Sequence, residues 1–267
     1  MSIGPDAARY LHAGIGGSVP RPFHLRWLLP AVCGRHLRRW WVVYALSWPL
    51  LAVSAFAWQS DKGWQVAAAT AVLLVALPGI LGPSVVAPVG VDLPSSALAL
   101  AGVAAWPHCW PLAVACWFLA AAAKETAPVF AALWLWHPVP LLLLVVPAVT
   151  HLVKHPGPDP LGPQFQRISD HPFRASLQHH AGRWRDGWLM VAPWGACLAA
   201  LYAPDWRLFV TLAAAYGLLL VATDSVRLYQ HAAGPVMAAT AAQVIPPQFL
   251  PLALVAHVAW WRTPERI

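Results

Sequence analysis

The chain has 267 residues, of which 59% are hydrophobic and only 10% are charged, and its formal net charge is +7. A soluble domain carries about 25% charged residues, so this composition argues against a soluble globule. It also leaves no soluble basic face for a nucleic-acid partner. We expect an all-α, polytopic integral membrane protein with about eight to ten short helices broken by Pro and Gly, in one membrane domain that covers residues 1–267.

The N-terminal part of the chain is polar before the first apolar run. Residues 1–21 are expected to form a polar loop or an amphipathic segment. A short apolar segment follows Pro22, and a basic cluster at residues 35–39 precedes the apolar run Trp40–Trp58. Basic residues beside membrane segments favour the cytoplasmic side, which predicts a cytoplasmic position for this cluster.

The middle of the chain contains apolar segments that are too short to span a bilayer alone. They lie at residues 64–81, 96–106, 111–123, 127–136 and 139–153. Pro and Gly separate these segments, which is typical of membrane helices that break around a cavity. Residues 154–187 are expected to form one long polar loop, and four further apolar segments follow at 188–203, 208–223, 226–245 and 250–261.

Ionisable residues among the apolar segments are the main candidates for function, because charges are costly inside a membrane. They occur at four places: Asp6 with Arg9 and Tyr10, then Arg26, then Lys124–Glu125, and finally Asp224 with Arg227. The alternative interpretation is structural. Lys124 and Glu125 would then end a helix near water, and Asp224 and Arg227 would form an i,i+3 surface pair.

Four histidines suggest a different site. His151 and His155 stand one helical turn apart, a spacing that can bind a metal, and His179 and His180 are adjacent. The second pair is similar to the HxxHH boxes of membrane di-iron enzymes, but Ser176 occupies the place of the leading His. A His-rich membrane metalloenzyme is therefore kept as an alternative function, while the leading interpretation includes no metal.

The order of these motifs resembles bacterial GT-C-type integral membrane glycosyltransferases. The resemblance consists of Asp6, Tyr10, the segment PFHLRWLLP with Arg26, the pair Lys124–Glu125 and the segment DSVRLYQHAAGP with Asp224 and Arg227. It implies a multi-pass protein of the bacterial inner membrane, short for the superfamily and lacking the usual first membrane helix. Such a protein takes a sugar from a polyprenyl-phosphate donor and transfers it to a membrane or cell-envelope acceptor on the extracytoplasmic side.

The resemblance also implies roles for individual residues. Asp6 is the expected catalytic residue, since a carboxylate can take the proton of an acceptor hydroxyl. The expected substrate-binding residues, which hold or orient the donor phosphate, are Tyr10, Arg26, Lys124, Glu125, Asp224 and Arg227. The expected partners are membrane lipid and a lipid-linked sugar, and no cofactor is expected. A nonenzymatic membrane subunit or transporter is the remaining alternative.

Overall fold

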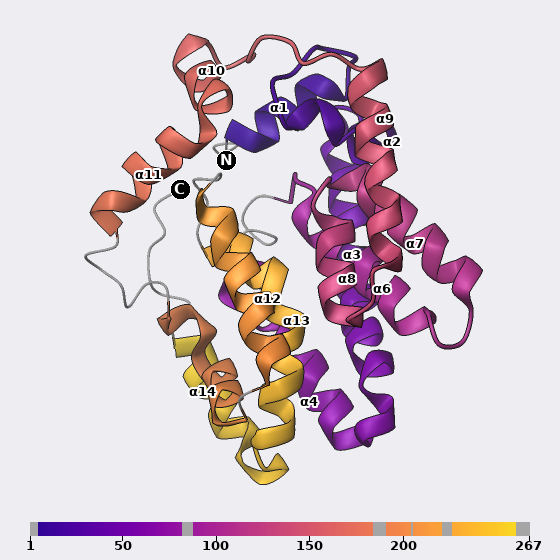
Figure 1. Cartoon of the computed structure of the whole chain (residues 1–267), viewed down its shortest axis with the longest axis vertical. Helices are drawn as coiled ribbons and strands as arrows, with labels where there is room; N and C mark the ends of the chain where they lie inside the picture. The colour runs from indigo at the N-terminus through magenta and orange to yellow at the C-terminus, as the bar shows by residue number, and fades with distance from the viewer. Residues whose placement is uncertain (1–4, 82–87, 184–190, 204, 221–225, 260–267) are drawn as a thin grey trace. The chain divides into compact units, whose positions relative to one another are not determined.

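A computed structural model describes residues 5–81, 88–183, 191–203, 205–220 and 226–259, and in these ranges the chain forms helices and turns but no strand (Figure 1). The predicted all-α class is confirmed for this part of the chain. The chain divides into two compact units, Met1–Pro49 with Ser84–Pro172 and Leu50–Pro83 with Phe173–Ile267. Each unit is described by itself.

The first unit contains the N-terminal helices and the middle of the chain. It begins with α1 (Pro5–Ala13), the 3₁₀ helix η1 (Phe23–Leu25), α2 (Leu28–Cys33) and the first part of α3 (Leu37–Trp58). It continues with α6 (Asp92–Ala105), α7 (Trp110–Ala123), α8 (Ala127–Leu135), η3 (Val139–Leu144), α9 (Val145–Val153) and α10 (Pro163–Asp170).

Helices α6, α7 and α8 pack against one another and form the core of the first unit (Figure 1). Their contact faces are rich in alanine, which lets the helix backbones approach closely. At Gly102 of α6 there is no room even for a methyl group, because a Cβ atom there would lie 2.3 Å from the indole nitrogen of Trp117. That nitrogen donates a hydrogen bond to the Ala99 carbonyl at 3.1 Å, so the buried indole is fixed against α6.

The segment around Arg26 is held next to the end of α7. Trp27 and Leu28 pack against Ala121, Ala122 and Val146, which lie on α7 and α9. Lys124 and Glu125 follow α7 directly, and Lys124 has extended backbone angles that end the helix before α8 begins. The packing of α2 on α7 and α9 therefore places Arg26 near two ionisable residues that lie almost 100 positions later in the sequence.

Backbone contacts hold α1 against α2. Gly14 follows α1 and Gly34 follows α2, and a Cβ atom on Gly14 would lie 2.6 Å from the carbonyl carbon of Gly34. Gly34 has a φ of 56°, a conformation that favours glycine, and its carbonyl accepts a hydrogen bond from the Trp40 indole at 3.0 Å. Two glycines thus allow the ends of the two short helices to meet.

Residues 154–187, which were expected to form a long polar loop, contain two helices. They are α10 (Pro163–Asp170) and α11 (Pro172–Arg183), and each begins at a proline. Proline is favourable in the first turn of a helix, where its missing N–H has no intrahelical partner to lose. The proline-rich composition of this stretch therefore marks helix starts as well as turns.

The second unit is organised around α13 (Val226–Val244). This helix packs against α4 (Trp64–Val75), η5 (Ala192–Tyr202) and α12 (Trp206–Gly217). The other described elements of this unit are the end of α3, η2 (Ser60–Lys62), α11, η6 (Leu218–Leu220), η7 (Pro247–Phe249) and α14 (Leu250–Ala259).

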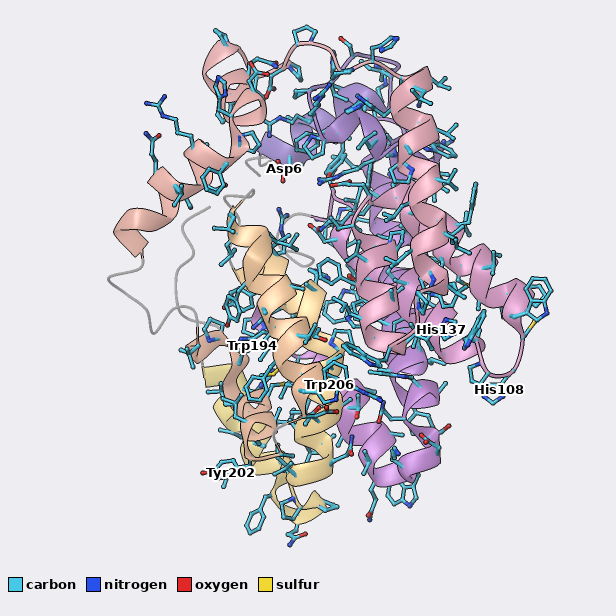
Figure 2. The ribbon with its side chains drawn as sticks, viewed as in Figure 1. Asp6, His108, His137, Trp194, Tyr202 and Trp206 are labelled. Atoms are coloured by element: carbon cyan, nitrogen blue, oxygen red, sulfur yellow. The ribbon has the colours of Figure 1, made fainter. Side chains whose placement is uncertain are left out.

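A glutamine ties three segments of the second unit together. The fully buried Gln230 of α13 accepts a hydrogen bond from the Gly79 amide at 2.6 Å and donates one to the Pro193 carbonyl at 2.7 Å. Trp194, which Figure 2 labels, follows Pro193, and its indole donates to the Tyr216 hydroxyl at 2.8 Å. These bonds join polar groups that would otherwise be buried without partners.

Within the described residues, one helix is long and apolar enough to cross a membrane, namely α3, with a mean hydropathy of 1.5. A second span would result if Arg227–Val244 and Pro247–Val255, which are bent by 116°, were counted as one. The shorter apolar helices, of 10–17 residues, lie at Trp64–Val75, Asp92–Ala105, Trp110–Ala123, Val139–Val153 and Trp206–Leu220.

Candidate functional site

The first unit contains a group of charged and aromatic side chains that we call the N-terminal cluster. It consists of Asp6, Arg9, Tyr10, Phe23, Arg26, Glu125 and Asp159. Three of these residues are on α1, where Figure 2 labels Asp6 near the start of the helix. The others come from η1, the turn after it, the turn before α8 and the segment after α9.

Arg26 and Glu125 form a two-pronged ion pair. The Nε and Nη2 atoms of Arg26 donate to the two carboxylate oxygens of Glu125 at 2.8 and 2.7 Å. The Nη1 atom donates to the Tyr10 hydroxyl at 2.8 Å. Both charged side chains are mostly buried, with 13% of Arg26 and 19% of Glu125 exposed. Burial raises the pKa of Tyr10, so its hydroxyl keeps its proton.

Arg9 joins two carboxylates. Its Nε and Nη2 atoms donate to one oxygen of Asp159 at 3.0 and 2.6 Å, and its Nη1 atom donates to Asp6 at 3.0 Å. The Asp159 side chain is completely buried, whereas 33% of the Asp6 side chain is exposed. Asp159 is thus a structural partner of Arg9. Of the two carboxylates, Asp6 is the one that solvent or a substrate can reach.

Phe23 separates the two guanidinium groups of the cluster. The central carbon of Arg9 lies 4.8 Å from the centre of the Phe23 ring, and that of Arg26 lies 5.2 Å from it. Tyr10 packs against the same ring, with 5.2 Å between ring centres. Because an aromatic face attracts cations, Phe23 favours the approach of two positive groups that would otherwise repel each other.

Lys124 forms a separate ion pair with Asp92, which lies in the first turn of α6. Only 8% of the Lys124 side chain is exposed, so this lysine does not lie at a solvated helix end. A charge with so little access to water needs a partner of opposite sign. Reasoning from the sequence identified Lys124 but missed Asp92 as its partner, and it also missed Asp159.

The remaining two expected residues are not part of the N-terminal cluster. Asp224 lies outside the described residues. Arg227 is half-buried near the start of α13 and belongs to the second unit. The described part of the chain therefore brings together Asp6, Tyr10, Arg26 and Glu125, with Lys124 next to Glu125 in sequence.

The histidine of α9 contacts another histidine. The Nε2 atom of His24 and the Nδ1 atom of His151 lie 3.0 Å apart and share a hydrogen bond. His155 lies after the end of α9, while His179 and His180 are on α11. Among the residues that the structure describes, no group of three or more His, Cys, Asp or Glu side chains is arranged to hold a metal ion. The described residues therefore provide no set of metal ligands for the metalloenzyme alternative.

A cleft of about 300 Å³ opens beside the N-terminal cluster. Its walls come from the segment between α1 and η1, from η1 and α2, and from the two residues after α9. Arg26, His24, Lys154 and His155 line it, whereas Asp6 and Tyr10 do not. The cleft is therefore a basic hollow that shares Phe23 and Arg26 with the N-terminal cluster and does not include the candidate catalytic residue.

Comparison with protein-family models, with curated proteins and with solved structures found no match for this chain.

Proposed function

We propose that the chain is a membrane-embedded glycosyltransferase that moves a sugar from a polyprenyl-phosphate donor to a membrane or cell-envelope acceptor. The proposed location is the bacterial inner membrane, with several crossings and with the reaction on the extracytoplasmic side. The proposal rests on the resemblance of the motif order and on the N-terminal cluster, which brings an accessible carboxylate close to an oriented arginine.

In the proposed reaction Asp6 acts as the base that takes the proton of the acceptor hydroxyl. A base must be reachable by the acceptor, and Asp6 is the most exposed carboxylate of the cluster. Its hydrogen bond from Arg9 fixes the orientation of the carboxylate.

Arg26 is proposed to hold the phosphate that departs with the lipid. A guanidinium has five N–H groups, and Glu125 and Tyr10 accept hydrogen bonds from its Nε, Nη1 and Nη2 atoms. Each terminal nitrogen carries a second N–H that can bind phosphate oxygens, for which the planar fork of arginine is well suited. Glu125 would act by positioning Arg26.

The membrane location is supported by exposed apolar surface on the longest helix. Val42, Leu46, Leu50, Val53 and Phe56 lie along one face of α3 and are all exposed. Exposed apolar patches of this kind are rare on soluble monomers and mark surfaces that contact lipid or another protein. The short apolar helices broken at proline fit membrane segments that surround a cavity.

The proposal is tested by measuring sugar transfer from a polyprenyl-phosphate donor to membrane acceptors with purified full-length protein. Replacing Asp6 by Asn removes the base, and we expect the rate to fall by about 10²–10⁴-fold. Asp61→Asn is the matched control, because Asp61 is an exposed aspartate of η2 outside the cluster. Transfer that survives Asp6→Asn would remove Asp6 from the mechanism, and a wild-type chain inactive with every prenyl-linked sugar would refute the proposal.

A further inference from the structure

The cleft beside the N-terminal cluster has the features of an anion site. Arg26 lies in its wall, and Lys154 and His155 are exposed at its edge. Every one of its thirteen lining residues is described, and none is an aspartate or a glutamate. Glu125, which pairs with Arg26, does not line it. The basic groups of the cleft therefore meet no carboxylate within the cleft itself.

A buried histidine atom in this wall has no partner. Only 6% of His24 is exposed, and its Nδ1 atom is buried without a hydrogen bond to any described group. The other ring nitrogen, Nε2, shares a hydrogen bond with His151. If His151 donates that bond, Nδ1 of His24 carries a proton. Because Nδ1 is buried, His24 contributes to the wall of the cleft and does not offer this atom to a ligand.

Lys154 is held at the edge of the cleft by a tight backbone contact. The Gly157 amide donates to the Val19 carbonyl at 2.9 Å. A Cβ atom on Gly157 would lie 2.4 Å from the Cβ of Ser18, so only glycine allows the two segments to come this close. The Nζ atom of Lys154 lies 5.7 Å from the centre of the Trp27 ring. In the described part of the chain Lys154 forms no ion pair with a carboxylate.

An exposed apolar face of α9 ends one residue before Lys154. Val145, Val149, Leu152 and Val153 lie along one face of α9, and all four are exposed. Lys154 is the next residue. A basic residue at the end of an exposed apolar helix face is typical of the boundary between lipid chains and phosphate head groups, where the aromatic ring of a tryptophan is also favoured.

We propose that the cleft binds the phosphate of a lipid whose hydrocarbon chains lie along the exposed face of α9. Lys154 and His155 contact the phosphate at the edge, beside Arg26 in the wall. The charge of the cleft selects an anionic head group, and the apolar face of α9 selects a lipid over a soluble phosphate. Arg26 lines this cleft and also belongs to the proposed transfer site, so the assignment deepens the proposed function, but lipid binding is measured without sugar transfer.

The test measures binding to the purified full-length chain in detergent by titration calorimetry, without any sugar donor. The probe is dihexanoyl phosphatidic acid, and the comparison ligands are dihexanoyl phosphatidylcholine and inorganic phosphate. We expect phosphatidic acid to bind, phosphatidylcholine to bind more weakly, and inorganic phosphate to compete poorly. Removing one hydrogen-bond donor to the phosphate, by Lys154→Gln or by His155→Gln, should weaken phosphatidic acid binding about tenfold.

Both substitutions change exposed side chains, so the variants should keep their fold. Lys62→Gln is the matched control, because Lys62 is an exposed lysine of η2 that does not line the cleft. Unchanged affinity in both cleft variants would overturn the site. Equal loss in the control would overturn it as well, and so would equal affinity for phosphatidylcholine. Displacement by inorganic phosphate at equal concentration would overturn the assignment to a lipid.

Discussion

Replacing Glu125 by Leu should leave a buried arginine without its counter-ion. Arg26 loses two charged hydrogen bonds in this variant and keeps only the bond to the Tyr10 hydroxyl. Breaking a buried ion pair costs about 3–5 kcal/mol. Because 13% of Arg26 and 19% of Glu125 are exposed, we expect the lower end of that range, about 3 kcal/mol.

The assay is unfolding in mixed detergent micelles, followed by tryptophan fluorescence. The informative comparison is the double variant Arg26→Met with Glu125→Leu, which removes both charges. It should lose less stability than Glu125→Leu alone, because the main cost is the charge left unpaired. Asp61→Leu is the control, since it breaks an exposed pair with Lys62 and should cause almost no loss. The reasoning fails if Glu125→Leu is as mild as Asp61→Leu, or if the double variant is the least stable.

Three further outcomes follow from buried contacts, each measured as the free energy of unfolding. Gly102→Ala places a methyl group against the fixed indole of Trp117 and should cost about 1–3 kcal/mol, and an unchanged stability would contradict that contact. Gln230→Leu leaves a backbone amide and a backbone carbonyl without partners and should cost about 2–4 kcal/mol, whereas a neutral result would mean that water replaces the glutamine. Burial, with a smaller contribution from a neighbouring histidine, lowers the pKa of His24. The folded chain then binds fewer protons than the unfolded chain, so stability is complete above about pH 6.5 and falls as the pH falls further. His24→Gln should flatten this decline, and an equally steep decline would refute it.

The all-helical class was predicted from composition, because few charges and long apolar runs favour membrane helices over a soluble globule. The ionisable candidates were predicted from the same reasoning, because a charge in apolar surroundings is costly and is therefore a candidate for function. Arg26 and Glu125 were identified in this way, and the structure pairs them.

The partners themselves could not be predicted from the sequence. Asp159 stands in a proline-rich stretch that gives no sign of burial, yet its side chain is completely buried against Arg9. Asp92 pairs with Lys124 only because α6 and α7 pack side by side. Such pairings depend on how helices pack in three dimensions, and one sequence contains no direct record of that packing. For the same reason α10 and α11 were hidden within a stretch whose polarity suggested a loop.

The pair of Arg9 and Asp159 also sets an order of events during synthesis of the chain. The two residues are 150 positions apart, so at about 5–20 residues per second Asp159 is made roughly eight to thirty seconds after Arg9. Until then Arg9 has only Asp6 of its own helix as a partner, and docking of α1 would bury its Nε and Nη2 atoms without their acceptor. Helix α1, the first of the described helices in chain order, is therefore among the last to reach its final place. The N-terminal cluster is completed only when the segment that contains Asp159 packs against α1.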